Sequence, residues 1–198
     1  MLIVKQITVN ISRVLILIIL LTNISCNTAP TDEANRRLKI VYTEWSESIA
    51  ITYLSTVLLE QEMDYTVELK LTDIETVYKE IAENKADVFM DAWLPETHKK
   101  YIDEYPQKID QLGIVYPEAR IGFVVPTYST LKTVADLKNY KHPIIGIDKG
   151  AGVMQKARLA INQYDLPHEL LDLSEKEMLQ HLEDSIKRRN EVVVTGWD

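Results

Sequence analysis

The feature that most limits how this chain can fold is a regular alternation of strand-like and helix-like segments after residue 37. Short apolar or alternating runs predict strands at 38–42, 67–71, 86–93, 121–126, 144–147 and 191–197. Apolar residues at helical spacing predict helices at 50–58, 74–81, 96–101, 153–163 and 178–186. Two of these helices follow candidate capping boxes, Thr72–Glu75 and Ser174–Glu177. The alternation favours an α/β architecture with parallel strands, whose binding sites lie at the carboxyl ends of the strands.

The first 25 residues have the pattern of an export signal. Lys5 and Arg13 precede an unbroken apolar run at 14–21, and small or polar residues follow it. A run this short does not cross a bilayer as a mature helix, which needs about 20 residues. We therefore predict a signal peptide at residues 1–25. The alternative is a single uncleaved membrane anchor over residues 2–21.

Cys26 is the only cysteine of the chain and directly follows this segment. A lone cysteine cannot form an internal disulfide, so its position needs another reason. The position resembles that of a bacterial lipobox, which implies cleavage before Cys26 and acylation of its thiol and amino groups. Acyl chains would hold an exported lipoprotein at the bacterial cell membrane, facing the periplasm or the outside, with residues 26–37 as a polar tether.

Charge and motif content exclude two classes of function. The net charge of −8 argues against nucleic acid as a partner, because phosphate binding needs a clustered basic face. The single basic triplet, residues 187–189, is interpreted as the end of a helix. The sequence contains no Gly-x-Ser-x-Gly elbow, P-loop, His-Glu-x-x-His motif or cysteine pair. We therefore predict no enzyme, no cofactor and no metal site.

Three tryptophans, Trp45, Trp93 and Trp197, lie at the ends of predicted strands. Their ordinary interpretation is that of half-buried residues packing where a strand ends. Together, however, they can form a cage for a cation that has no N–H to donate, such as a trimethylammonium group. Each ring face attracts such a cation by roughly 0.5 to 2 kcal/mol. The three residues therefore predict a cation site.

A glycine-rich turn, 150–153, begins one of the predicted helices. Free backbone N–H groups at a helix N-terminus bind anions, although an ordinary strand-to-helix turn would have the same composition. A cation cage and an anion site in one cleft would suit a zwitterion.

Four segments, 45–50, 91–98, 146–154 and 195–197, together resemble the glycine betaine-binding proteins of osmoprotectant ABC importers. The resemblance covers residues 38–197. It implies a two-lobe periplasmic-binding-protein-like fold of type II with a central cleft, lobe 1 at 38–122 and lobe 2 at 123–198. Members of this family continue beyond the Gly-Trp pair, so the resemblance also implies an incomplete second lobe. We expect such a chain to be unstable and to bind ligand weakly.

The resemblance also implies roles for individual residues. Trp45, Trp93 and Trp197 would cage a quaternary ammonium, and three further residues would bind the ligand carboxylate: His98, Gly152 and Val153. Lys149 and Val153 differ from the proline and isoleucine usual in the family, which is tolerable because backbone groups make the contacts.

The implied function is that of a solute-binding lipoprotein, a monomer that delivers glycine betaine or a related osmoprotectant to ABC permease and ATPase subunits. Two alternatives remain open. The ligand could be choline, carnitine or proline betaine, since each presents a methylated ammonium. The protein could also be a sensor or surface lipoprotein that uses the fold without transport.

Replacing Cys26 by serine tests the predicted anchor. Labelled palmitate should be incorporated into the wild-type protein and not into Cys26→Ser, which should shift to the soluble fraction because it lacks acyl chains. Continued membrane attachment of the variant would instead support the uncleaved apolar anchor.

Overall fold

The computed structural model describes residues 36–198. The predicted signal peptide, Cys26 and nearly all of the predicted tether lie outside the described residues. Within residues 36–198, no helix combines the length and apolar character required to cross a bilayer.

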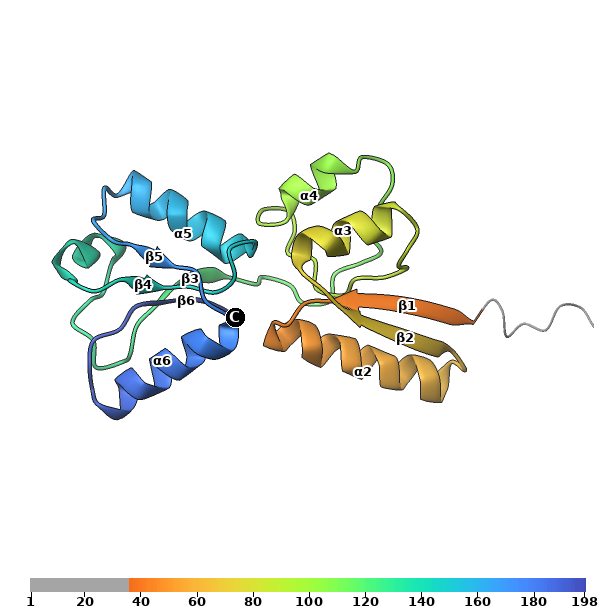
Figure 1. Ribbon diagram of the computed structural model, residues 1–198, viewed down its shortest axis with the longest axis horizontal. Coiled ribbons are helices and arrows are strands. Elements are labelled where there is room, and N and C mark those ends of the chain that lie inside the picture. Colours follow the sequence, from red (N-terminus) through yellow and green to blue (C-terminus); the bar gives the residue numbers. More distant parts are fainter. Residues whose placement is uncertain (1–35) are drawn as a thin grey trace, which may run out of the picture. The chain divides into compact units, whose positions relative to one another are not determined.

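The first sheet contains two parallel strands, β1 (Arg37–Tyr42) and β2 (Thr66–Leu71). The connection between them is helix α2 (Ser46–Glu62), and α3 (Ile74–Ala82) follows β2. Figure 1 shows α2 and α3 on opposite faces of this sheet. The next helix, α4 (Lys99–Glu104), lies beside α3 and contacts it.

The second sheet has four strands in the order β3-β6-β4-β5. They are β3 (Ile121–Val124), β4 (Ile144–Ile145), β5 (Leu170–Leu171) and β6 (Val194–Trp197). β4 pairs in parallel with β5 and β6, whereas β3 pairs antiparallel with β6. The expectation of purely parallel strands is therefore wrong for β3. The predicted lobe boundary at residues 122/123 falls inside this strand and stays a prediction.

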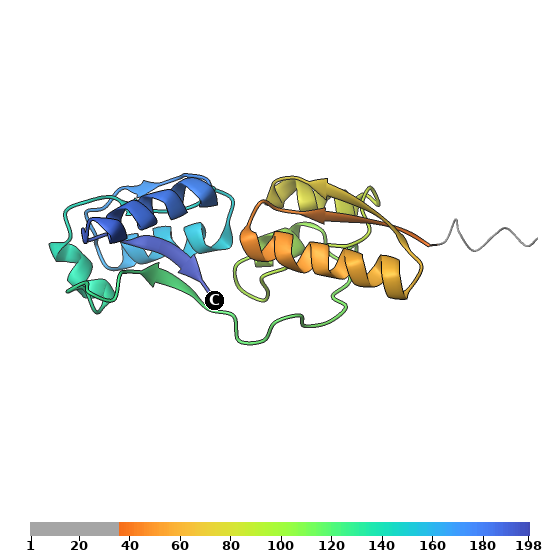
Figure 2. The same cartoon turned by 90° about the horizontal axis from the view of Figure 1, so that it is seen from below.

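Three helical segments accompany the second sheet. They are the 3₁₀ helix η2 (Val134–Asn139) and the α-helices α5 (Gly152–Gln163) and α6 (Glu175–Lys187). α5 and α6 flank the sheet on opposite sides (Figures 1 and 2). The basic triplet 187–189 does lie at the end of α6, as predicted. Neither η2 nor β5 was predicted, because both are too short to show a periodic pattern.

The predicted strand at 86–93 is wrong. This segment makes only a single bridge, between Val88 and Ile40, beside β1. β1 ends at Tyr42, two residues beyond Ile40, and therefore offers little backbone for a longer ladder. The chain leaves the sheet after Val88 and carries Asp91 and Trp93 away from it.

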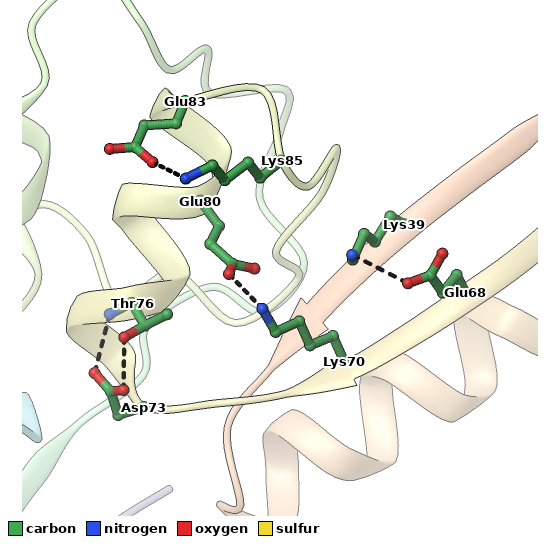
Figure 3. Close-up of polar contacts among 8 residues, drawn as sticks. All are labelled: Lys39, Glu68, Lys70, Asp73, Thr76, Glu80, Glu83 and Lys85. Atoms are coloured by element: carbon green, nitrogen blue, oxygen red, sulfur yellow. Dashed lines mark hydrogen bonds and ion pairs between the residues drawn. The ribbon is translucent and has the colours of Figure 1, made fainter.

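The two predicted helix starts have different outcomes. Ser174 and Glu177 form the predicted capping box at the start of α6. The predicted box at Thr72–Glu75 is wrong, because the N-cap of α3 is Asp73. Asp73 accepts hydrogen bonds from the backbone N–H of Thr76 at 2.9 Å and from its hydroxyl at 2.7 Å (Figure 3).

Ion pairs connect the strands of the first sheet to each other and to α3. Lys39 on β1 lies 3.0 Å from Glu68, its register partner on β2. Lys70 on β2 pairs with Glu80 on α3 (Figure 3). Beneath these surface contacts, the largest apolar cluster includes residues of both sheets, such as Val41 and Val194. This apolar cluster therefore includes side chains from both sheets.

Replacing Asp73 by alanine should lower the free energy of unfolding by about 1 kcal/mol, because the first turn of α3 would lose its side-chain cap. Urea unfolding followed by circular dichroism measures this loss. Asp73→Asn is the control, since its amide oxygen still accepts from Thr76. Equal unfolding midpoints for the two variants would contradict the assigned cap.

Candidate functional site

A pocket is lined by the first residues of α2 and α5 together with the segment 93–98 and the strands β3 and β6. All six residues predicted to bind a ligand line it: Trp45, Trp93, His98, Gly152, Val153 and Trp197. Five lining residues were not predicted: Glu47, Thr97, Ile121, Ile147 and Ala151. The structure thus brings together residues that lie far apart in the sequence.

Trp45 is the N-cap residue of α2 and is almost completely buried, with 4% of its surface exposed. Its indole N–H donates to Asp148 Oδ2 at 2.7 Å, across 103 residues of sequence. Its ring also packs against the ring of His98, with the ring centres 5.9 Å apart. These contacts hold the indole in one orientation at the pocket wall.

Trp93 and Trp197 are half-buried and reach the pocket from different segments. Trp93 follows the bridge at Val88, and its indole N–H donates to Asp91 Oδ1 at 2.8 Å. Trp197 is the last residue of β6 and pairs with Ile121 of β3, another residue of the pocket wall.

His98 is fully buried, with 0% of its surface exposed. Its Nδ1 lies 3.1 Å from the backbone nitrogen of Trp93 and 3.1 Å from the hydroxyl of Tyr78. Because the Trp93 N–H can only donate, Nδ1 accepts, and the neutral ring carries its proton on Nε2. Burial, with a smaller effect from the charge of Lys100, lowers the pKa of His98 to about 3. Nε2 has no hydrogen-bond partner within residues 36–198, so a neutral N–H donor is left unused.

The N-terminus of α5 supplies further donors. No side chain caps this helix, whose N-cap is Ala151. The N–H groups of an uncapped first turn, here those at Gly152 and Val153, are available to an anion. A side chain at position 152 would meet Thr97, since a Cβ atom there would lie 2.1 Å from the Thr97 Cβ. Glycine therefore lets α5 approach the segment that carries Trp93 and His98.

Two acids at the pocket, Glu47 and Asp91, have raised pKa values. Burial and the nearby charge of Glu47 raise the pKa of Asp91 to about 8, although hydrogen bonds from Trp93 and Ser48 oppose this shift. Burial also raises the pKa of Glu47, while hydrogen bonding by Trp197 acts in the opposite direction. Their nearness to Trp93 and Trp45 in sequence was the only available signal for these acids. Within residues 36–198, no group of three or more histidines, cysteines or acids could hold a metal ion.

Comparison with known proteins gives one family and several relatives. Residues 36–198 match the family described as the substrate binding domain of ABC-type glycine betaine transport systems. The glycine betaine/carnitine transport binding protein GbuC of Listeria monocytogenes serotype 1/2a (strain 10403S) is 32% identical over 105 residues. That match covers 52% of this chain and 35% of GbuC.

Two solved structures share the fold. Lactococcal OpuAC in its closed-liganded conformation with glycine betaine has a TM-score of 0.76 and 32% identity, over 82% of this chain and 65% of that one. The glycine betaine/L-proline-binding protein ProX of Borrelia burgdorferi has a TM-score of 0.77 and 33% identity, over 82% and 63%. The chain thus spans less than two thirds of the length of these proteins. The predicted α/β fold of the periplasmic-binding-protein type II class is confirmed.

Replacing Gly152 by alanine should destabilise the protein by about 1 to 3 kcal/mol, because the added methyl group overlaps the packed side chain of Thr97. Thermal unfolding followed by circular dichroism measures the loss. Gly113→Ala is the matched control, since no atom lies within 4 Å of a Cβ built there. An unfolding midpoint for Gly152→Ala equal to that of the control would refute the close approach of α5.

Proposed function

Since this chain belongs to the family of substrate-binding domains of ABC-type glycine betaine transport systems, we propose that it captures glycine betaine or a close quaternary-ammonium relative. We propose further that it does so outside the cytoplasm, as a monomer anchored through Cys26, and delivers the ligand to an ABC permease and ATPase. The observation that carries the proposal is the presence of three tryptophans from three separate segments in one pocket wall.

The tryptophans suit the cationic end of such a ligand. A trimethylammonium group has no N–H, so carboxylates attract it without orienting it, whereas indole faces can surround it and exclude water. Trp45, Trp93 and Trp197 line the pocket together, and Glu47 adds a carboxylate to the same wall. We assign these tryptophans to the ammonium group.

The donors on His98 and α5 suit the ligand carboxylate. His98 offers a neutral N–H at Nε2, and the first turn of α5 offers the backbone N–H groups of Gly152 and Val153. Because the pKa of His98 is about 3, this donor stays neutral at physiological pH and acts by hydrogen bonding rather than by charge. We therefore place the carboxylate between His98 and α5.

The alternatives differ at this carboxylate end. Choline lacks a carboxylate and would leave the buried His98 donor unpaired, which is unfavourable by about 1 to 3 kcal/mol. Carnitine and proline betaine carry both a methylated ammonium and a carboxylate. A sensor that does not transport would bind the same class of ligand. We propose binding without catalysis, because the family is that of substrate-binding domains of transport systems.

Titration calorimetry of the purified full chain tests the ligand assignment. Glycine betaine should bind more tightly than 3,3-dimethylbutanoate, its uncharged-head analogue of the same shape, and more tightly than choline. Trp93→Ala should weaken glycine betaine binding by about 1 to 2 kcal/mol, or roughly five- to thirtyfold, the contribution of one desolvated cation–π contact.

The matched control is Tyr116→Ala, which removes an exposed aromatic ring that does not line the pocket. It should bind glycine betaine as the wild type does. Equal binding of glycine betaine and its uncharged-head analogue, or unchanged affinity in Trp93→Ala, would rule out the proposed cage.

A further inference from the structure

Two of the three pocket tryptophans donate their indole N–H to a carboxylate. Trp45 Nε1 lies 2.7 Å from Asp148 Oδ2, and Trp93 Nε1 lies 2.8 Å from Asp91 Oδ1. The indole nitrogen can only donate, so in both bonds the carboxyl oxygen accepts, and both distances are those of well-formed hydrogen bonds. Each bond fixes the rotation of its ring, because the N–H must point at the acid.

No basic side chain balances these acids. None of the ion pairs formed within residues 36–198 includes Asp91, Asp148 or the neighbouring Glu47. A partly buried carboxylate without a cationic partner is unfavourable for the folded protein. Holding an indole needs only an acceptor, which an amide or a backbone carbonyl would provide. The choice of acids here therefore needs a reason other than stability.

We infer that Asp91 and Asp148 are positioning residues that aim two indole faces at the ligand and, in their ionised forms, place negative charge behind the rings, so that a permanent cation is preferred to a neutral group of the same shape. The inference rests on the proposed function, because it concerns how the pocket recognises its ligand. Charge behind the ring adds to the attraction of the ring itself, and a half-buried pocket screens it less than water does.

Asp148 has a second connection within the pocket. It lies in the loop between β4 and α5, and its backbone carbonyl accepts from the N–H of Ala151, the N-cap of α5, at 3.1 Å. The same residue thus holds the indole of Trp45 by its side chain and the start of the anion-binding helix by its backbone. Displacing Asp148 would disturb both ends of the pocket.

Asp91 acts locally, on a tryptophan two residues away. The groups that face it are Glu47 from α2, Tyr78 from α3 and the hydroxyl of Ser48. Glu47 and Asp91 repel one another when both are ionised. The ammonium group of a bound ligand would offset this repulsion, because it attracts both carboxylates. Binding of a cation should therefore favour the ionised form of Asp91.

Indole N–H signals in a ¹⁵N-labelled sample test the positioning role without any ligand. The chain has three tryptophans, so it should give three indole signals. Asp91→Asn should move the signal of Trp93, and Asp148→Asn that of Trp45. Asp103→Asn, which removes an exposed acid paired with Lys99, should move neither. In the wild type and in the variants that retain Asp91, the Trp93 signal should also shift as the pH passes through the pKa of Asp91, about 8, whereas in Asp91→Asn it should not.

Affinities test the preference for charge. At a pH above the pKa of Asp91, about 8, each of the two pocket variants should bind glycine betaine about tenfold more weakly than the wild type, within the range of one cation–π contact. Binding of 3,3-dimethylbutanoate should be unchanged or tighter. The Asp103→Asn control should match the wild type for both compounds.

Thermal unfolding shows that the variants are folded. Because the pKa of Asp91 is raised in the folded protein, stability falls as the pH rises from the ordinary carboxyl value of about 4 towards 8. Asp91→Asn should therefore unfold at a higher temperature than the wild type in alkaline buffer.

The outcomes separate this inference from the proposed function. Indole signals that stay in place in both variants would overturn the inference, whether or not glycine betaine binds. Equal losses of affinity for glycine betaine and for its uncharged-head analogue would also overturn it, since charge would then play no part. A wild type that binds no quaternary ammonium would refute the proposed function even if the indole signals move as expected.

Discussion

The pocket depends on the way His98 holds the turn at residues 93–98 closed. Its Nδ1 accepts from the Trp93 backbone and from the Tyr78 hydroxyl on α3, so the ring connects the turn to the first sheet. The same turn presents Thr97 to Gly152, whose missing side chain allows α5 to approach. One buried ring thereby sets the position of a tryptophan, of a neutral donor and of the start of a helix. A protonated His98 could not accept from the Trp93 N–H, and the low pKa of about 3 excludes that state near neutral pH.

The polar groups of the pocket form two sets, one of acids and one of neutral hydrogen-bond donors. Glu47, Asp91 and Asp148 are acids that lack a basic partner within residues 36–198. His98 Nε2 and the uncapped turn of α5 are donors that lack an acceptor side chain. Each set is unfavourable when isolated from water and favourable when it faces the opposite group of a zwitterion. An inorganic anion or a simple alkylammonium would satisfy only one of the two sets.

Much of this site was accessible from the sequence because its members occur in local patterns. A tryptophan after an apolar run and a glycine-rich helix start are readable within a few residues, whereas His98 was predicted only through the family resemblance. All six predicted site residues line one pocket. Contacts across long sequence separations were not readable. The Trp45–Asp148 bond spans 103 residues. The antiparallel pairing of β3 with β6 also depends on how distant segments pack. The predicted strand at 86–93 failed for a related reason, since its apolar residues pack against the core beside only one bridge to β1.

The unpaired acids and the unpaired donors of the pocket also determine how ligand binding changes the stability of the fold. When both acids are ionised, repulsion between Glu47 and Asp91 lowers the stability of the folded state, as does the unpaired His98 donor. A bound zwitterion would offset both losses of stability. Its cation would attract both acids, and its carboxylate would accept a hydrogen bond from His98. A ligand that binds only the folded state raises the free energy of unfolding by mass action. The increase is about 2.7 kcal/mol when the free ligand concentration is a hundred times Kd. The acids and donors that lower the stability of the fold when they are unpaired are thus the same groups through which a zwitterion would stabilise it.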